Sequence, residues 1–454
     1  MAYLPNSDDE RRQMLDAVGA GSVTDLFSAV PAALLKPPLE LPPPLGEQEL
    51  VATVSALAAR NRPLSGWDAF LGAGVYHRFS PAIVLGTISR PEFYTAYTPY
   101  QAEASQGTLQ TIFEFQTMIC ALTGLDVANA SLYDGATAAA EALMLAVAHT
   151  GRSRVAVSRG VHPETRRVIA TYAQGRAVGV DWVEPEAGST TVAGARAVLT
   201  DQHAALLVAQ PSFQGTVDDL RPLVEAAHAV GALGVAAVDP IACTVLASPG
   251  ETGVDVAVGD GQPLGIPAQF GGPHVGFMAV RQTLLRRLPG RLVGLTVDHA
   301  GDRAYTLTLQ TREQHIRREK ATSNICTNHA LMALAATAYM AHMGAGGMSR
   351  VAEVSARRAH ALAERLAALP GFALAYPEQP FLWEFTLRCP TDARSMVERL
   401  RERGIIAGLP LVEVDAGAAD HLLVCCTELT PPDAISRYVD AAADMARVAT
   451  GSPA

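Results

Sequence analysis

The sequence predicts an α/β protein: a large domain with a mostly parallel sheet, preceded by a helical arm and followed by a small α+β domain. Short apolar runs rich in β-branched residues recur between residues 155 and 258 and alternate with helix-like segments. Continuous apolar strands that alternate with helices are typical of a parallel sheet covered on both faces. The chain has 454 residues, of which 49% are hydrophobic, so it can supply two domains and an extension with core.

Residues 1–64 predict an arm. Ser7 and Glu10 form a capping-box pattern ahead of a short helix. The proline-rich run 36–44 excludes both helix and inner strand, and a helix over 47–59 follows. Because so thin a segment holds no core of its own, we expect the arm to wrap a neighbour, either the main domain or a second subunit.

The large domain, residues 65–325, is expected to contain the sheet. Long helices over 108–123 and 136–149 come first. Ligands of open α/β sheets bind beyond the carboxyl ends of the strands, so the loops after the strands are the candidate sites. The runs predicted as strands are 155–157, 178–180, 205–208, 235–238, 254–258 and 275–280.

Residues 326–454 have a different texture and predict a connecting helix with a small C-terminal α+β domain. An alanine-rich helix over 328–369 leads into this domain. Its expected strands are 381–387 and 422–426, and its expected helices are 393–403 and 432–448.

Composition narrows the class of protein. The formal net charge is -10 and no Lys/Arg stripe is visible, which argues against nucleic-acid binding. The six cysteines form no CxxC pair, so we interpret them as small core residues in a reducing compartment, with no metal site. The N-terminus has no apolar signal core, and the most apolar helical stretch, 330–341, is too short for a membrane span. A cytoplasmic protein without a membrane segment is expected.

Two loops after predicted strands carry candidate ligand groups. Asp134, Gly135 and Thr137 open a helix, where small residues leave free N–H groups that can hold a phosphate. The alternative is an ordinary capped helix with Asp134 as the cap. His162 follows a strand and precedes a helix opened by Pro163, where it could stack on a planar cofactor or simply make local hydrogen bonds.

A further pair of loops has the acid that a pyridoxal phosphate site needs but lacks its lysine. Asp239 follows a core strand, where an acid can pair with the ring nitrogen of pyridoxal phosphate, and Gln262 follows the next strand. Pyridoxal phosphate enzymes of the aminotransferase fold (type I) have a lysine there, which binds the cofactor as a Schiff base. Arginine cannot replace that amine. The chain has two lysines, Lys36 in the proline-rich run and Lys320 on a predicted charged helix over 312–320. We therefore predict no Schiff base within this chain.

These features accompany motifs that resemble the glycine decarboxylase P-protein of the glycine cleavage system, over most of the chain. Within that family the sequence is similar to the alpha subunit, also called subunit 1, of the two-subunit bacterial form. The motifs are Tyr97-Thr98-Pro99-Tyr100-Gln101, Glu103, Ser105-Gln106-Gly107, Glu114, Gln116-Thr117, Ala128 to Thr137, Gly259 to Gln262 and Phe270 to His274.

The resemblance implies a division of labour. The family's beta subunit has an NLHKTFxIPHGGGGPG-type segment, and placing Ile266-Pro267 and Gly271-Gly272-Pro273 on it puts Gln262 on the lysine. Pyridoxal phosphate is then bound by the beta subunit, in a probable α2β2 assembly, and the chain alone has no catalytic residue. The implied reaction decarboxylates glycine and passes the aminomethyl group to the lipoyl arm of the H-protein, as an oxidoreductase acting on CH–NH2.

The resemblance implies that this chain contributes to function through its loops. We expect residues 97–103 to line the partner's active site, since tyrosines give a flat wall with a polar tip; a buried turn is the alternative. A vestigial cofactor pocket is expected from a second set of residues. Two other functions stay open: a purely structural or regulatory subunit, and a lysine-less enzyme that uses pyridoxamine phosphate. The interface set is Tyr97, Thr98, Tyr100, Gln101 and Glu103, and the pocket set is Asp134, Gly135, Thr137, His162, Asp239 and Gln262.

Overall fold

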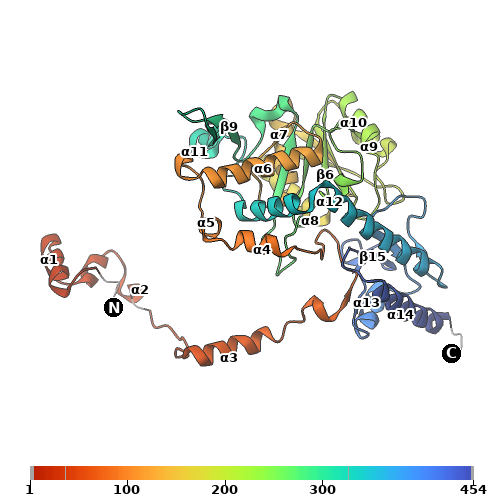
Figure 1. Cartoon of the computed structure of the whole chain (residues 1–454), viewed down its shortest axis with the longest axis horizontal. Helices are drawn as coiled ribbons and strands as arrows, with labels where there is room; N and C mark the ends of the chain where they lie inside the picture. Colours follow the sequence, from red (N-terminus) through yellow and green to blue (C-terminus); the bar gives the residue numbers. More distant parts are fainter. Residues whose placement is uncertain (1–4, 36, 326, 451–454) are drawn as a thin grey trace. The chain divides into compact units, whose positions relative to one another are not determined.

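The structure is a computed structural model that describes residues 5–35, 37–325 and 327–450 (Figure 1). It forms two compact units, Met1–Pro63 and Leu64–Ala454, and each is considered by itself. The first unit ends one residue before the border predicted after residue 64, and that border stays a prediction. The border predicted after residue 325 falls inside the second unit and stays a prediction. Lys36 and Cys326 lie outside the described residues.

The first unit is a string of short helices. Its elements are α1 (Asp8–Val18), the 3-10 helix η1 (Val23–Phe27), α2 (Ala32–Leu35) and α3 (Glu47–Ala58). The capping box predicted for Ser7 and Glu10 is confirmed, because each residue's side chain accepts a hydrogen bond from the other's backbone N–H. None of its described residues is buried.

The second unit is built around a seven-stranded sheet in the order β2-β8-β7-β6-β5-β3-β4. The pairs from β7 through β6, β5 and β3 to β4 are parallel, while β8 is antiparallel to both of its neighbours. The mostly parallel sheet is thus confirmed. Its strands are β2 (Val127–Ala128), β3 (Arg154–Ser158), β4 (Gly179–Val183), β5 (His203–Gln210), β6 (Leu233–Val238), β7 (Val256–Asp260) and β8 (Gly276–Val280).

Helices cover both faces of this sheet (Figure 1). In β3, Val155 and Val157 pack into a core with α7, whereas Ala156 between them belongs to the opposite core with α6, α10 and α12. Apolar residues on successive positions are therefore all buried, which explains the uninterrupted apolar runs. The helices are α6 (Gln106–Thr123), α7 (Gly135–Thr150), α8 (Pro163–Gly175), α9 (Val192–Val198), α10 (Leu220–Ala229) and α12 (Ala330–Ala367).

Smaller elements complete the second unit. A four-stranded antiparallel sheet in the order β11-β12-β15-β14 carries α13 and α14, as the α+β texture predicts. The long helix α12 is interrupted at Gly344, whose φ is 60°. The remaining bounds are β1 (Asp68–Ala69), α4 (Ala82–Ile88), α5 (Pro91–Tyr94), β9 (Val293–Val297), β10 (Arg303–Leu307), β11 (Ala373–Leu374), β12 (Glu384–Arg388), α13 (Ala393–Arg401), β13 (Ile405–Ile406), β14 (Leu409–Pro410), β15 (His421–Cys425) and α14 (Pro432–Thr450).

The prediction of one charged, solvated helix over 312–320 is wrong. The segment consists of α11 (Gln314–Arg317) and the 3-10 helices η6 (Gln310–Arg312) and η7 (Arg318–Lys320). Arg318 breaks the helix with a φ of 54°. Glu313 is buried near Arg291, so part of the run contributes to the interior. Lys320 itself is exposed.

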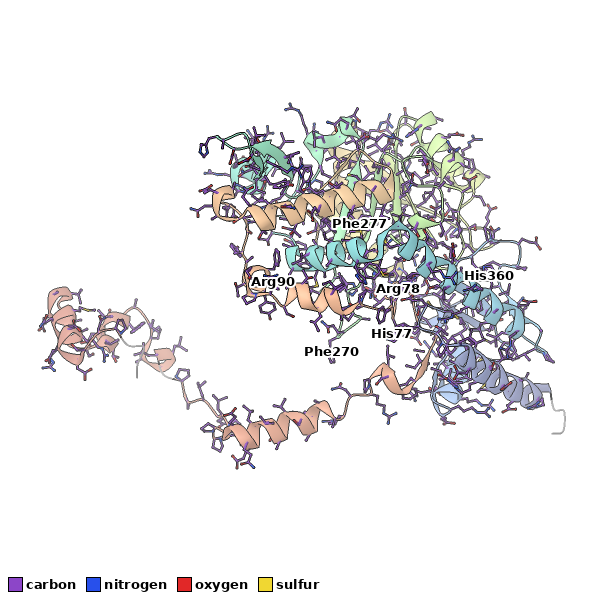
Figure 2. The ribbon with its side chains drawn as sticks, viewed as in Figure 1. His77, Arg78, Arg90, Phe270, Phe277 and His360 are labelled. Carbon is purple, nitrogen blue, oxygen red and sulfur yellow. The ribbon has the colours of Figure 1, made fainter. Side chains whose placement is uncertain are left out.

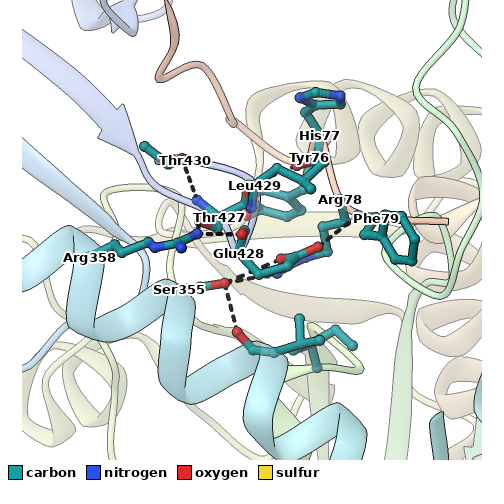
Figure 3. A network of polar contacts seen from close by, with 12 residues as sticks. Tyr76, His77, Arg78, Phe79, Ser355, Arg358, Thr427, Glu428, Leu429 and Thr430 are labelled. Atoms are coloured by element: carbon teal, nitrogen blue, oxygen red, sulfur yellow. Dashed lines mark hydrogen bonds and ion pairs between the residues drawn. The ribbon is translucent and has the colours of Figure 1, made fainter. Parts of the chain in front are cut away.

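A buried arginine links the start of the second unit to helix α12 and to the turn after β15 (Figure 3). Arg78 donates from Nη1 to Glu428 Oε2 at 2.8 Å and to Ser355 Oγ of α12 at 3.1 Å. Its guanidinium also lies 4.7 Å from the ring centroid of Trp383. Glu428 in turn accepts from the backbone of Phe79 at 2.7 Å. Residues 78–79, which closely follow the cavity-lining residues 73–76 in the chain, are thereby fastened to the turn after β15.

One loop of the second unit points away from the core. Phe270 is 98% exposed, in the glycine-rich turn between β7 and β8 (Figure 2). No helix of the described chain is both long and apolar enough to cross a membrane.

Candidate active-site cavity and tyrosine loop

A cavity of about 360 Å³ lies beyond the carboxyl ends of β3, β5, β6 and β7. This is the edge at which an open α/β sheet places its ligands. Four of the six residues predicted for the vestigial pocket line it together: Asp134, Gly135, His162 and Asp239. Thr137 and Gln262 do not line it.

Asp134 and Thr137 serve as a helix cap. Asp134 Oδ1 accepts from the Thr137 backbone N–H at 2.7 Å and from its hydroxyl at 2.8 Å. The Thr137 hydroxyl oxygen accepts in return from the Asp134 backbone N–H at 3.2 Å. A short polar side chain at this position satisfies N–H groups that the first turn leaves free. The capped-helix alternative describes the geometry of these two residues.

Asp260, at the end of β7, also reaches the start of α7. Its Oδ2 accepts from the Gly135 backbone N–H at 3.0 Å, and its Oδ1 accepts from the Gln262 backbone N–H at 2.9 Å. His274 Nδ1 lies 3.4 Å from the same Oδ2, and this carboxylate raises the pKa of His274. The other imidazole nitrogen of His274 is buried without a hydrogen-bond partner.

His162 is held at the edge of the cavity by both ring nitrogens. Nδ1 accepts from the Glu164 backbone N–H at 3.1 Å, so Nε2 carries the proton and donates to the Ala73 carbonyl at 3.0 Å. Its ring packs edge-to-face on Phe213, with centroids 4.9 Å apart. Burial lowers the pKa of His162, which favours the neutral ring.

Asp239 occupies the floor of the cavity after β6. Its Oδ1 accepts from the backbone N–H groups of Ile241 at 2.7 Å and Ala242 at 3.1 Å. Burial raises its pKa, although Arg78 opposes that shift. The acid predicted opposite a cofactor ring nitrogen is therefore present at the cavity surface.

Gln262 faces away from the cavity and binds the backbone behind it. Its Oε1 accepts from the Tyr76 N–H at 2.9 Å, and its Nε2 donates to the Tyr76 carbonyl at 2.9 Å and to the Ile266 carbonyl at 2.8 Å. The residue is 1% exposed. These three hydrogen bonds use both amide N–H donors and one lone pair of the oxygen, and all of them go to backbone.

The segment 73–76, whose Tyr76 backbone is bound by Gln262, is also held by Glu384 of β12. Glu384 Oε1 accepts from the Ala73 N–H and Oε2 accepts from the Tyr76 hydroxyl, both at 2.6 Å. Burial raises the pKa of Glu384 to about 7. A Cβ at Gly72 would lie 2.4 Å from Glu384 Oε1, so the close approach requires glycine there.

The tyrosine loop, residues 97–103, borders a second cavity of about 280 Å³ against the start of α12. Tyr97 is 77% exposed, and within the described chain its hydroxyl has no hydrogen-bond partner. Tyr100 is 56% exposed, but its hydroxyl accepts from Arg291 Nη2 at 3.1 Å. Gln101 and Glu103 are also exposed, while Thr98 is half-buried. A buried turn, the alternative interpretation, does not describe these tyrosines.

Sequence reasoning did not single out four residues of the first cavity: Tyr76, Asp260, His274 and Glu384. Asp260 and His274 had a visible signal, because each follows or precedes a strand within a motif of the family resemblance. Tyr76 and Glu384 had none. They come from segments 308 residues apart that meet only in the folded chain.

Comparison with known proteins identifies the family of this chain. A family model described as "Glycine cleavage system P-protein" matches residues 1–441. The "Probable glycine dehydrogenase (decarboxylating) subunit 1" of Thermomicrobium roseum is 48% identical over 443 residues, which cover 97% of this chain and 99% of that protein. Its counterpart in Moorella thermoacetica is 47% identical over 442 residues, with the same coverage. The chain belongs to the glycine cleavage system P-protein family.

Solved structures agree with this placement of the P-protein chain. A crystal structure of glycine decarboxylase (P-protein) in inhibitor-bound form is 44% identical, covers 98% of this chain and 100% of that one, and superposes with a TM-score of 0.89. A sphingosine-1-phosphate lyase of Burkholderia pseudomallei, at 15% identity and a TM-score of 0.65, shares the fold alone. The predicted family, the type I fold of pyridoxal-phosphate enzymes and the assignment to a P-protein subunit of the oxidoreductase class are confirmed.

The cavity of this P-protein chain does not fit pyridoxal phosphate. Gln262 cannot form a Schiff base and its amide is already hydrogen-bonded to backbone. At the start of α7, where a cofactor phosphate would need N–H donors, Gly135 and Thr137 donate to the carboxylates of Asp260 and Asp134. Among the predicted pocket residues, Asp239 and His162 line the cavity at positions that suit a pyridine ring.

Proposed function

We propose that this chain is the subunit of a glycine-decarboxylating P-protein that holds no cofactor and completes the active site of a beta subunit that does, in the cytoplasm. The observation that carries the proposal is Gln262, whose buried amide is bound on three sides by backbone. Relatives named as subunit 1 support the existence of a second subunit. Pyridoxal phosphate in that subunit would supply the electron sink for loss of the glycine carboxyl group as CO2.

The overall reaction balances with the lipoyl arm of an H-protein as the acceptor. The carbon left after loss of CO2 keeps its amino group and bonds to one lipoyl sulfur. The lipoyl disulfide opens, and the other sulfur leaves as a thiol. Carbon is oxidised and the disulfide is reduced, so no further oxidant is needed.

This chain contributes to the partner's active site through the tyrosine loop. Tyr97 presents a phenol that makes no hydrogen bond to the described residues. Tyr100 is oriented by the buried Arg291, whose guanidinium carbon lies 5.3 Å from the Tyr100 ring centroid. Exposed tyrosines, one of them oriented by a buried arginine, are suited to wall a neighbour's substrate pocket and to exclude water from it.

The test is to purify the chain alone and co-expressed with a beta subunit from the same genome. We expect a stable complex, of α2β2 mass, that catalyses glycine–bicarbonate exchange and holds all of its pyridoxal phosphate in the beta subunit. The chain alone should show neither exchange nor a cofactor absorbance. Exchange by the isolated chain, with added pyridoxal or pyridoxamine phosphate, would contradict the proposal and favour a lysine-less enzyme.

A further inference from the structure

The start of α7 is the part of the cavity that differs most from a cofactor site. Helix N-termini attract anions because their first N–H groups have no partner within the helix and lie at the positive end of the helix dipole. Here an anion is already provided by the protein. Asp260 comes from the neighbouring strand β7, 125 residues from Gly135 in sequence, and its carboxylate accepts the Gly135 N–H.

We propose that Asp260 acts as an internal substitute for a phosphate, and that it excludes phosphate-bearing cofactors from this chain independently of the missing lysine. The negative charge that would belong to a ligand is a permanent part of the fold. A phosphate group brought to the same N–H groups would meet the carboxylates of Asp260 and Asp134 at close range, and like charges in a partly buried site repel strongly.

Three contacts fix the Asp260 carboxylate. It accepts the N–H groups of Gly135 and Gln262 at 3.0 and 2.9 Å, and His274 Nδ1 stands 3.4 Å away. The surrounding backbone is equally close: a Cβ at Gly135 would lie 2.9 Å from the Asp260 nitrogen. The carboxylate is thus too well held to swing aside for a ligand.

Removing this carboxylate would release the donors that a phosphate uses. Gly135 N–H and Gln262 N–H would lose their acceptor, and the His274 imidazole would lose its anionic neighbour. The cavity of about 360 Å³ beside them would still present Asp239 and His162 to a pyridine ring. Replacing Asp260 therefore removes one of the two carboxylates that oppose a phosphate and raises the affinity for it, whereas a Schiff base would need a second substitution, at Gln262.

The experiment compares pyridoxamine 5′-phosphate with pyridoxamine, because an amine ligand cannot form a Schiff base with Lys36 or Lys320. Binding to the full-length chain is measured by calorimetry for the wild type, Asp260→Asn, which removes the charge, and Asp260→Ser, which also removes volume. We expect Asp260→Ser to bind pyridoxamine 5′-phosphate at least about tenfold more tightly than wild type, with Asp260→Asn between them. Pyridoxamine itself should gain much less.

Asp298→Asn is the matched control, since Asp298 is another aspartate that accepts two backbone N–H groups, in an exposed turn. It should leave both affinities unchanged. Equal binding of the phosphate ligand by wild type and the two Asp260 variants, or no binding by either variant while both keep the wild-type circular dichroism, would overturn the proposal. The inference relies on the proposed function only for the location of the cofactor in a partner. Because the measurement uses this chain alone, its failure is distinct from a failure of glycine exchange in the complex.

Discussion

The cavity at the sheet edge and the tyrosine loop are both candidate sites, but their polar groups are used in opposite ways. In the cavity, Asp134, Asp260 and Glu384 all accept hydrogen bonds from the chain itself. In the loop, Tyr97 is exposed and its hydroxyl has no partner among the described residues. Carboxylates that already accept hydrogen bonds from the chain have little to offer a ligand, whereas an exposed hydroxyl without such a bond can act on a neighbour.

This difference shows that the presence of a cavity and its capacity to bind a ligand have separate causes. The volume at the sheet edge follows from the fold, since strands of a parallel sheet end there whatever residues follow them. Its capacity to bind follows from individual donors and acceptors. The four predictions below test whether the cavity is mainly structural and the loop mainly functional.

The largest effect is expected behind the cavity, at Arg78. Arg78→Ala should lower the free energy of unfolding by about 3–5 kcal/mol, because it removes the cation beside the largely buried Glu428 carboxylate, which keeps only neutral hydrogen-bond donors. Denaturant unfolding of the full chain measures this loss. Arg437→Ala is the control: that arginine pairs with Asp68 at 2.6 Å but is exposed, so its loss should cost much less stability than the loss of Arg78. Equal effects in both variants would mean that Arg78 is not the fastening described here.

Glu384 should make stability depend on pH. Its pKa is raised by burial from 4.5 to about 7, so the folded chain keeps a proton that the unfolded chain loses between these values. Stability from this group is therefore full below about pH 4.5 and declines as the pH rises to 7, by up to roughly 3 kcal/mol. Glu384→Gln cannot ionise and should lack that decline.

The measurement is the difference between wild type and Glu384→Gln at each pH. Asp218, whose pKa burial raises to about 6, gives a trend of the same sign in both proteins and cancels. A difference that stays constant from pH 4.5 to 8 would show that Glu384 is ionised throughout.

Restoring the lysine should fail at Gln262. Gln262→Lys removes three hydrogen bonds and leaves the Tyr76 N–H without an acceptor, at an expected cost of about 1–3 kcal/mol of stability. Added pyridoxal phosphate should give no imine absorbance or a weak one, because Asp260 and Asp134 still oppose the phosphate. A strong imine band together with wild-type stability would refute both expectations.

The smallest free-energy change is expected in the tyrosine loop, and it should lower the exchange rate of the complex and not its stability. Tyr97→Phe should reduce glycine–bicarbonate exchange by the assembled complex about 2–10-fold, equivalent to the loss of one hydrogen bond, with assembly intact. Tyr94→Phe is the matched control, a neighbouring tyrosine of similar exposure outside the loop. Tyr100→Phe is a less clean probe because it also removes the partner of Arg291. Wild-type rates in Tyr97→Phe would leave the loop a structural feature.

Patterns local in sequence allowed much of this molecule to be predicted. The runs at 155–157 and 235–238 became β3 and β6 because buried parallel strands are apolar on both faces. The Ser7 capping box and the start of α7 at Asp134 depend on residues three positions apart. Gln262 was located by its register within a motif, although its contacts were not.

Long-range contacts could not be predicted from these patterns. Nothing in the sequence around Glu384 indicates that it meets Tyr76, or that Arg78 meets Ser355 across 277 residues. The charged run 312–320 misled the prediction because mixed charge is typical of a solvated helix, whereas Glu313 is buried beside Arg291. Burial of a charged residue depends on partners brought by other segments.

The arm precedes every strand of the large sheet in chain order and is therefore synthesised before them. Its described residues bury nothing within the first unit, and α3 exposes Leu50, Val54 and Leu57. At about 5–20 residues per second, a ribosome needs roughly 10–40 s after the arm to reach the last strand of the large sheet. Throughout that interval the apolar residues of α3 are already synthesised while the large sheet is still incomplete. The length of that stage, in which α3 can meet chaperones or other nascent chains, is therefore set by translation rate.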